Sequence, residues 1–415
     1  MSSAPLLQII AVGQQDTDLT TNPQITFFKQ VYKRHVPFAI QTVPVMFGQR
    51  FTLGSSISVN IERLGDLVTN MTLFVKLNSL KSEGDFTWID NLGNAMIQKI
   101  ELEIGGSIVN RQYGEWVHIW NEFSQPAAKK NVYKSLIGGQ STQDGQELYI
   151  PLNFWFCRYT TLALPLIALA HHTVKVNIQT RTLGELTQFT AGCQCKVADN
   201  YNIVDSASLL VDYVYLNTEE RRKIATEEHR FLIDEVQTTG TITIPKGTKQ
   251  NRYSLTFAHP VKSLYWVFQD SSNRPASTGP NPDTSSFFRY HGRDAGNNEA
   301  PIAKHMQIKI NGQEFTYQFG EKFFNMLQPY YRHTGGGSGT TGPIPGLYNY
   351  NFCLRPEEHQ PTGTLNFSRV ENAFLHVEFN DNNNENIIEA IDFRCYALNY
   401  NILLIASGMG GVLYK

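Results

Sequence analysis

The residues best suited to chemistry lie in one short stretch, "RPEEHQP", at positions 355–361. Two carboxylates and a histidine so close together could act as general acid and base, or as metal ligands. The residues of this motif are Pro356, Glu357, Glu358, His359, Gln360 and Pro361. Proline within a sheet is confined to edges and bulges. The pattern therefore favours an extended edge segment, solvated or part of an interface, over a catalytic site.

Three further groups of residues could be proposed as sites. His171 and His172 could join Cys193 and Cys195 as zinc ligands, but adjacent residues on a strand point to opposite faces. The stretch "GGGSGTTG" lacks the Gly-Lys-Ser/Thr of a phosphate-binding loop and is typical of a flexible surface loop. Cys157 follows three aromatic residues and is typical of a small buried hydrophobe. We therefore expect no catalytic residue, no metal and no cofactor.

The composition excludes several classes of protein. Thirty-five Lys and Arg against 37 Asp and Glu give a net charge of −2, which leaves no excess to neutralise nucleic-acid phosphates. No apolar run reaches the ~18 residues that a membrane helix requires. Five cysteines in 415 residues are an odd and sparse set, so reduced thiols are expected. Charged residues are 17% of the chain, and the abundance of aromatic and polar residues favours an all-β fold.

A repeat indicates how such a fold is organised. "IELEIGGSIVNRQYGE" (100–115) and "MQIKINGQEFTYQFGE" (306–321) align without a gap and share five identical positions. In each copy an alternating strand runs into a pair of residues suited to positive φ, Gly105-Gly106 or Asn311-Gly312, and a second strand follows. Each copy therefore predicts a β-hairpin. The hairpins lie about half a chain length apart, which indicates one fold written twice.

The remaining elements fit two domains of about eight short strands each, as in a Greek-key sandwich or jelly roll. We expect a base segment over 1–36, jelly rolls over 37–216 and 238–415, and a helical connector over 217–237. Within the base segment, "NPQITFFKQVYKRH" (22–35) has the caps and apolar spacing of a short amphipathic helix. Two long loops, at 270–286 and 333–346, complete the pattern.

Residues 22–35, "RPEEHQPTGTLNFSR" (355–369) and "NYNILLIASGMGG" (399–411) resemble the major capsid proteins of nucleocytoplasmic large DNA viruses. The similarity is greatest to the chlorella-virus and iridovirus type and extends over nearly the whole chain. It implies a double jelly roll, and a homotrimer whose pseudo-hexameric capsomers tile the icosahedral capsid of the virion. It also implies assembly in the host cytoplasm, no direct contact with nucleic acid and no enzymatic activity.

The resemblance also suggests partners. Residues of the base segment would face the inside of the shell and contact minor capsid proteins and the internal membrane. They are Pro23, Phe27, Phe28, Tyr32 and Arg34. Alternatively, the aromatic side chains cover the open end of the first barrel. The two long loops would lie on the outward face. Two other functions stay open: a minor capsid paralogue of the same fold, and a two-domain β-sandwich that binds or processes carbohydrate.

Overall fold

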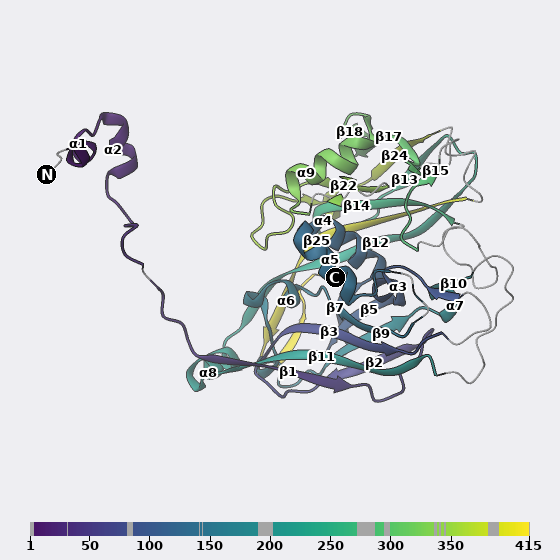
Figure 1. The fold of residues 1–415 in the computed structure, drawn as a ribbon, viewed down its shortest axis with the longest axis horizontal. Coiled ribbons are helices and arrows are strands. Elements are labelled where there is room, and N and C mark those ends of the chain that lie inside the picture. The colour runs from purple at the N-terminus through teal and green to yellow at the C-terminus, as the bar shows by residue number, and fades with distance from the viewer. Residues whose placement is uncertain are drawn as a thin grey trace. The chain divides into compact units, whose positions relative to one another are not determined.

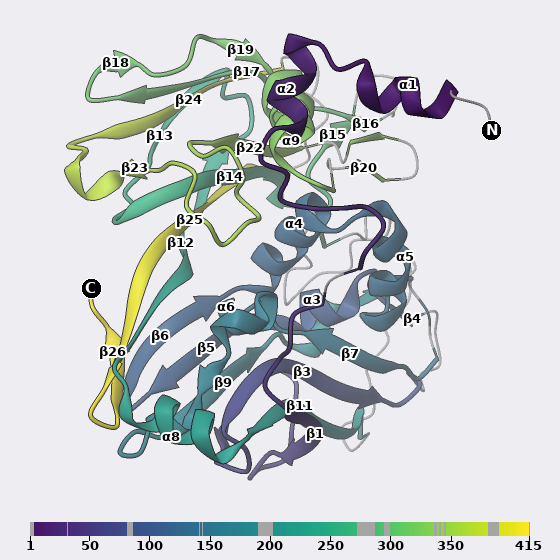
Figure 2. The same ribbon diagram turned by 90° about the vertical axis from the view of Figure 1, so that its left-hand side faces the viewer.

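The computed structural model divides into two units, residues 1–37 and residues 38–415. It describes residues 4–30, 32–80, 86–140, 142, 144–189, 202–271, 287–293, 299–335, 338–339, 342–343, 346–380 and 390–414. The larger unit contains two β-sandwiches of antiparallel strands, drawn in Figures 1 and 2. We call residues 38–216 the first jelly roll and residues 229–414 the second jelly roll.

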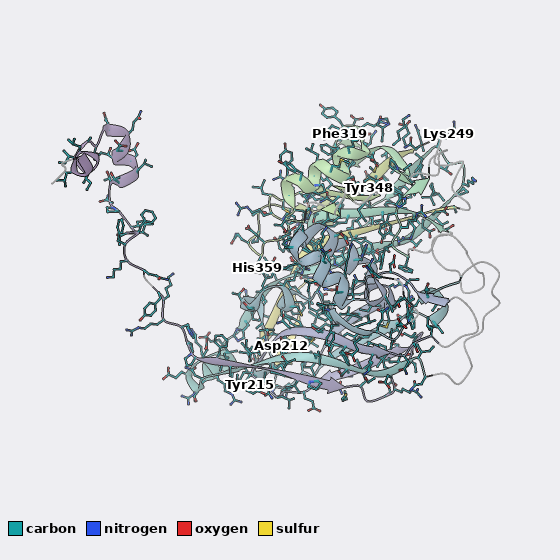
Figure 3. The ribbon with its side chains drawn as sticks, in the orientation of Figure 1. Asp212, Tyr215, Lys249, Phe319, Tyr348 and His359 are labelled. Carbon is teal, nitrogen blue, oxygen red and sulfur yellow. The ribbon has the colours of Figure 1, made fainter. Side chains whose placement is uncertain are left out.

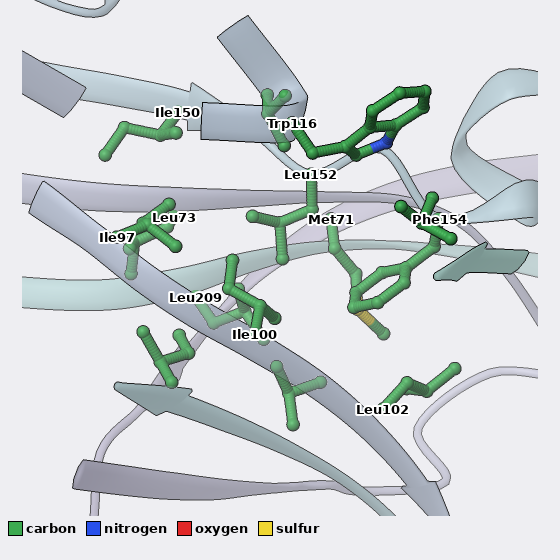
Figure 4. Packing of buried hydrophobic residues seen from close by; sticks show 14 of the residues in the cluster. Met71, Leu73, Ile97, Ile100, Leu102, Trp116, Ile150, Leu152, Phe154 and Leu209 are labelled. Atoms are coloured by element: carbon green, nitrogen blue, oxygen red, sulfur yellow. The ribbon is translucent and has the colours of Figure 1, made fainter. Parts of the chain in front are cut away.

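The first jelly roll consists of two four-stranded sheets that face each other, and one of them has an additional short strand. The β1 sheet has the order β1 (Phe38–Met46), β11 (Val204–Leu216), β3 (Leu67–Leu77), β7 (Glu147–Pro151), and β8 (Leu164–Pro165) also pairs with β3. The β2 sheet has the order β2 (Ser56–Ile61), β9 (Val174–Thr180), β5 (Ile97–Ile104), β6 (Ser107–Gln112). Apolar residues alternate along these strands and meet between the sheets, as Figure 4 shows for Met71, Leu102 and Leu209.

The second jelly roll repeats this strand order. The β12 sheet has the order β12 (His229–Pro245), β25 (Ala390–Ala406), β14 (Pro260–Asp270), β22 (Leu347–Asn351), with β23 (Leu365–Asn366) on β14 and β26 (Met409–Val412) on β25. The β13 sheet has the order β13 (Gln250–Ser254), β24 (Ala373–Phe379), β17 (Ala303–Ile310), β18 (Gln313–Glu314), with β19 (Phe319–Gly320) on β17. Strand for strand, the two sandwiches therefore share one topology, and the fold is a double jelly roll.

Short elements connect and flank the strands. The helices are α1 (Ala4–Ile10), α2 (Gln14–Thr20), α3 (Leu92–Met96), α4 (Gly114–Ser124), α5 (Ala127–Leu136), α6 (Trp155–Arg158), α7 (Leu183–Leu186), α8 (Thr218–Thr226) and α9 (Gln328–Arg332). A π-helix, η4 (Phe323–Leu327), runs into α9, and single 3₁₀ turns are η1 (Thr160–Leu162), η2 (Leu166–Ala168) and η5 (Phe367–Arg369). Small two-stranded sheets pair β4 (Phe86–Trp88) with β10 (Thr187–Phe189), β15 (Gly292–Arg293) with β16 (Glu299–Ala300), and β20 (Ser338–Gly339) with β21 (Gly342–Pro343).

The repeated segment forms the expected hairpin twice. In the first copy Ile104 pairs with Ser107 across Gly105 and Gly106, whose φ angles are 57° and 84°. In the second copy Ile310 pairs with Gln313 across Asn311 and Gly312, whose φ angles are 50° and 77°. Each turn thus has two residues in the left-handed region, which is the geometry of a tight two-residue hairpin. Each hairpin is followed by a helix at the same place, α4 in the first jelly roll and η4–α9 in the second.

Two expected helices differ from the structure. Residues 22–30 and 32–37 contain no helix, and Asn22 has a φ of 53° instead of serving as an N-cap. The prediction of a helix over 22–35 is wrong because its described apolar side chains, Ile25, Phe28 and Tyr32, are exposed, and an isolated helix of this length is only marginally stable. Two shorter helices, α1 and α2, precede this stretch instead.

The connector is helical only in its first half. Asn217 caps α8, because its Oδ1 accepts a hydrogen bond from the Glu220 N–H at 2.9 Å. The helix ends at Thr226, and from His229 onward the chain is strand β12. The prediction of a helix up to residue 237 is wrong because β25 supplies a strand partner for His229–Thr238 and, after a register shift, for Thr241–Pro245 of β12. Pairing with a neighbouring strand here overrides an apolar spacing that also fits a helix.

Candidate assembly surfaces

The two jelly rolls meet at a junction, where α4 lies against the β12 sheet (Figures 1 and 2). Every residue of α4 from Gly114 to Phe123 is buried. The rings of Trp116, Trp120 and Phe123 surround Tyr265 of β14, with ring centroids 5.2, 6.2 and 5.5 Å from that ring. Such aromatic contacts add to the hydrophobic gain of burying large side chains. The core of the first sandwich therefore continues across the junction onto the outer face of the β12 sheet, whereas the interior of the second sandwich is a separate apolar cluster.

An ion pair is buried inside this junction. Glu115 at the start of α4 accepts hydrogen bonds from Arg394 Nε at 2.7 Å and from the Tyr396 hydroxyl at 2.7 Å, both on β25. The side chains of Glu115 and Arg394 are each only 3% exposed. Burial by itself would lower the pKa of Arg394, but attraction to Glu115 outweighs it and the pKa is raised. Removing one partner of so deeply buried a pair strongly destabilises the fold, because the other charge is then left buried without a counter-charge.

A second charged group lies at the same junction. Asp234 of β12 contacts Lys262 Nζ at 3.3 Å and Arg158 Nη1 of the first jelly roll at 3.3 Å. Lys262 is fully buried, and its pKa is lowered because burial disfavours the ammonium ion and the carboxylate of Asp234 offsets this only in part. The backbone oxygen of Asp234 also accepts a hydrogen bond from Asn110 Nδ2 at 2.8 Å. These contacts join the first jelly roll to β12 of the second.

The 355–361 motif is part of the same junction. Glu357 accepts hydrogen bonds from the Thr334 N–H at 3.0 Å and from the Thr334 hydroxyl at 2.6 Å, and it pairs with His333 Nδ1 at 2.9 Å. Its backbone oxygen accepts from the hydroxyl of Tyr159 in the first jelly roll. His359, labelled in Figure 3, contacts the Leu232 oxygen at 3.1 Å and packs its ring against Tyr159.

The motif therefore joins the jelly rolls instead of forming a strand edge. Its backbone over 352–360 consists of turns and bends, so the prediction of an extended segment is wrong. The hydrogen bonds that Thr334 donates to the Glu357 carboxylate hold this segment, instead of backbone hydrogen bonds to a neighbouring strand. Pro356 is buried, Gln360 and Pro361 are exposed, and Glu358 pairs with Arg355 at 3.1 Å. The carboxylates and the histidine are thus engaged in structural contacts.

The residues of the other candidate sites form hydrogen bonds with backbone atoms, are buried, or lie outside the described residues. His172 Nδ1 lies 3.1 Å from the Gly410 nitrogen, and the His171 N–H donates to the Gly408 oxygen at 2.9 Å, so both histidines contact the hairpin of β25 and β26. Cys193 and Cys195 lie outside the described residues, as do 272–286 of the first long loop and 336–337, 340–341 and 344–345 of the second. Burial raises the pKa of Cys157 to about 12, so its thiol is not an activated nucleophile. Within the described residues no cluster of three metal-ligating side chains occurs.

One polar hollow of about 420 Å³ lies on the β13 sheet. It is lined by Gln250, Asn251, Arg252, His305, Gln307, Gln318, His376, Val377 and Glu378. Glu378 is the one carboxylate in this lining, and it is held by His305 Nδ1 at 3.1 Å and Gln318 Nε2 at 3.1 Å. Glycoside hydrolysis needs two carboxylates, and sugar-binding faces usually present an aromatic ring. This lining has neither a second carboxylate nor an aromatic side chain, so it does not fit the carbohydrate alternative.

The N-terminal unit, residues 1–37, presents apolar side chains to solvent. Phe27 is 88% exposed, Phe28 99% and Tyr32 81%. Pro23 and Arg34 lie in the same exposed stretch. Helix α1 adds Leu6, Leu7, Ile9 and Ile10. No helix among the described residues is long and apolar enough to cross a membrane.

Comparison with known proteins identifies the family. The family described as major capsid protein N-terminus matches residues 26–217, and large eukaryotic DNA virus major capsid protein matches residues 220–411. The major capsid protein of Pyramimonas orientalis virus is 34% identical over 437 residues, covering 99% of each chain. The chain belongs to the major capsid protein family of large eukaryotic DNA viruses.

Other members of the major capsid protein family agree. That of Paramecium bursaria Chlorella virus 1 is 31% identical, again over 99% of each chain. A chain of the PBCV-1 virus capsid has a TM-score of 0.78 at 28% identity, over 94% of this chain and 100% of that one. The Faustovirus major capsid protein, 12% identical with a TM-score of 0.76, shares the fold. Members of this family are structural proteins of the virion capsid, so the role of the chain is structural and not enzymatic.

Sequence reasoning missed the residues that hold the junction together. Arg394, Tyr265 and Tyr396 lie in strands whose apolar pattern gave no sign of a second buried face. Glu115 carried a signal, because it is identical to Glu321 in the repeat and directly follows a hairpin. A carboxylate that occurs in both copies of the repeat, and in the first copy precedes Trp116 and Trp120, could have indicated a buried ion pair.

Proposed function

We propose that three copies of this major capsid protein form a ring of six jelly rolls, a pseudo-hexameric capsomer that tiles an icosahedral shell. The observation that carries this proposal is the strand order, which is the same in both sandwiches. Two similar domains in each of three chains give a nearly sixfold outline, which can pack against identical neighbours on a flat facet. The shared core at the junction supplies the rigidity that such a building block needs.

The trimer is tested by light scattering after size-exclusion chromatography and by negative-stain microscopy of the purified chain. We expect three times the chain mass and particles with a hexagonal outline. A protein that is monomeric at every concentration tested, or particles with a square or irregular outline, would contradict the proposed capsomer.

We further propose that the base segment, residues 1–36, contacts minor capsid proteins and the internal membrane on the inner side of the shell. The exposed aromatic side chains Phe27, Phe28 and Tyr32 support this, since contiguous exposed apolar groups mark interaction sites. Pro23 and Arg34 are further candidate contacts. The three described cysteines, Cys157, Cys353 and Cys395, are free thiols, which suits assembly in the host cytoplasm.

A chain that lacks residues 1–36 tests the base segment. We expect it to form the same trimer as the full chain but to lose binding to vesicles or to inner-shell proteins in a flotation or co-purification assay. A matched variant with Phe27, Phe28 and Tyr32 changed to serine should behave like the truncation. Retained binding by both would show that the contacts lie elsewhere.

A further inference from the structure

The junction inside one chain defines two surfaces that bind each other. One is the helix that follows the hairpin of the first jelly roll, α4, and the other is the outer face of the β12 sheet with Tyr265 at its centre. Residues Val261 to Asp270 of β14 are all buried, because one face of the strand packs into its own sandwich and the other against α4. Each jelly roll has a helix after its hairpin and a sheet with the same strand order. Within the chain, the helix of the first jelly roll packs on the sheet of the second.

The register of the strands identifies the counterpart of the sheet surface. Five residues of β14, Ser263–Val267, pair with β22, and five of β3, Thr72–Lys76, pair with β7. The central residue of the first ladder is Tyr265 and that of the second is Phe74. Phe74 also packs against the ring of Tyr149, at 4.9 Å between centroids. Phe74 thus lies on the outward face of β3, as Tyr265 lies on the outward face of β14. The pairings with β8 and β23 match Val68 to Val261, which places Thr72, the neighbouring outward residue, opposite Tyr265.

The ungapped repeat identifies the counterpart of the helix. Extending the match of 100–115 with 306–321 places Trp120 opposite Met326. Met326 lies in η4, which together with α9 (residues 323–332) forms what we call the second helix. It presents Met326, Leu327, Tyr330 and Tyr331 to solvent. Tyr330 is 78% exposed, whereas the residues of α4 up to Phe123 are all buried.

The outer face of the β1 sheet also has exposed apolar side chains, next to polar ones. Phe38, Ile40, Met46 and Tyr149 are exposed large hydrophobic residues of this sheet. Its charges are already satisfied within the face: Lys76 pairs with Glu147 at 3.1 Å, and Asp212 accepts hydrogen bonds from Thr42 and Asn70 (Asp212 is labelled in Figure 3). Covering the face would therefore bury one ion pair and one carboxylate that already has two hydrogen-bond donors.

We propose that the second helix of one copy docks on the outer face of the β1 sheet of another copy, around Phe74, as α4 docks around Tyr265 within the chain. This inference rests on the proposed trimer and names its contact. The occupant is a second copy of this chain because the two unmatched surfaces are the counterparts of two that already bind each other. Such a head-to-tail contact uses different surfaces on each partner and can close into a ring.

The first test changes the second helix. The double variant Leu327→Asp/Tyr330→Asp puts two charges at exposed positions, so the chain should fold as before. We expect light scattering to give a monomer, and thermal melting and circular dichroism to report an intact chain. The control is Leu64→Asp, also at an exposed leucine but between β2 and β3, which should leave the trimer unchanged.

The second test joins the two surfaces covalently. The variant Phe74→Cys/Met326→Cys, treated with a short bis-maleimide, should give dimers and trimers on a denaturing gel. Each single-cysteine variant, which still contains the native cysteines, should give only monomer. A wild-type trimer that survives the double aspartate variant and yields no cross-link would overturn this contact alone. A wild-type chain that stays monomeric would overturn the proposed trimer and the contact together.

Discussion

The two jelly rolls share a strand order but differ in how many faces of one sheet are covered. In the second jelly roll, β14 is buried on both faces, and α4 of the first jelly roll supplies the outer cover. In the first jelly roll, the matching strand β3 alternates between buried and partly exposed residues, and β1 has no buried residue. Topology alone therefore does not decide which surfaces are core. What a repeated fold buries depends on its neighbour.

The largest effect is expected where the first helix fills the junction. Trp116→Ala should lower the free energy of unfolding by about 4 kcal/mol, because it leaves a cavity beside Tyr265 and Tyr396. The repeat places the exposed Lys322 opposite Trp116, so Lys322→Ala is the matched control and should change stability by less than about 0.5 kcal/mol. Urea denaturation measures both. If both variants lost the same stability, the two helices would not differ in burial.

The buried ion pair gives the next effect. Glu115→Gln should cost about 3 kcal/mol, since it leaves Arg394 buried without its counter-charge. Restoring a neutral pair with Glu115→Gln/Arg394→Met should recover part of this loss. The comparison fails if the double variant is less stable than the single one.

A smaller loss is expected at the 355–361 motif. Glu357→Ala removes the acceptor for two Thr334 bonds and the partner of His333, which should cost about 2 kcal/mol. Glu358→Ala removes an ion pair with Arg355 in which the two side chains are 52% and 68% exposed, so it serves as the control and should cost about 0.5 kcal/mol or less. A large loss at Glu358 with none at Glu357 would contradict the role assigned to the motif.

The smallest expected effect is a gain in stability, in contrast to the losses above. Glu321, the repeat partner of Glu115, has its pKa raised by burial, which a hydrogen bond from Tyr348 offsets only in part. At pH values around and above the usual carboxyl pKa of 4.5, the folded chain therefore binds more protons than the unfolded chain, and stability falls as the pH rises through this window. Glu321→Gln removes that loss, so melting temperatures should be equal near pH 3 and slightly higher for the variant at pH 7. A lower melting temperature at pH 7 would contradict this reading.

Local patterns predicted the strands and turns but not the junction. Gly105-Gly106 and Asn311-Gly312 specify hairpins because few residues accept positive φ, and this constraint acts within the chain segment itself. The helix expected over 22–35 and the second half of the connector depended on packing partners, which the segment does not encode. Arg394 and Tyr265 are equally non-local, since their partners lie more than a hundred residues away. The candidate assembly surfaces became visible only when the two repeats could be compared in space.

The continuous core at the junction also affects how the two halves can evolve. A substitution in α4 changes the folding of every newly made chain, so the cell's quality control acts on it before any particle exists. A substitution in the exposed residues of the second helix leaves this core unchanged. Under the proposed contact it would act only when two chains meet. The two helices would then be under different selection, and their sequences could diverge at different rates.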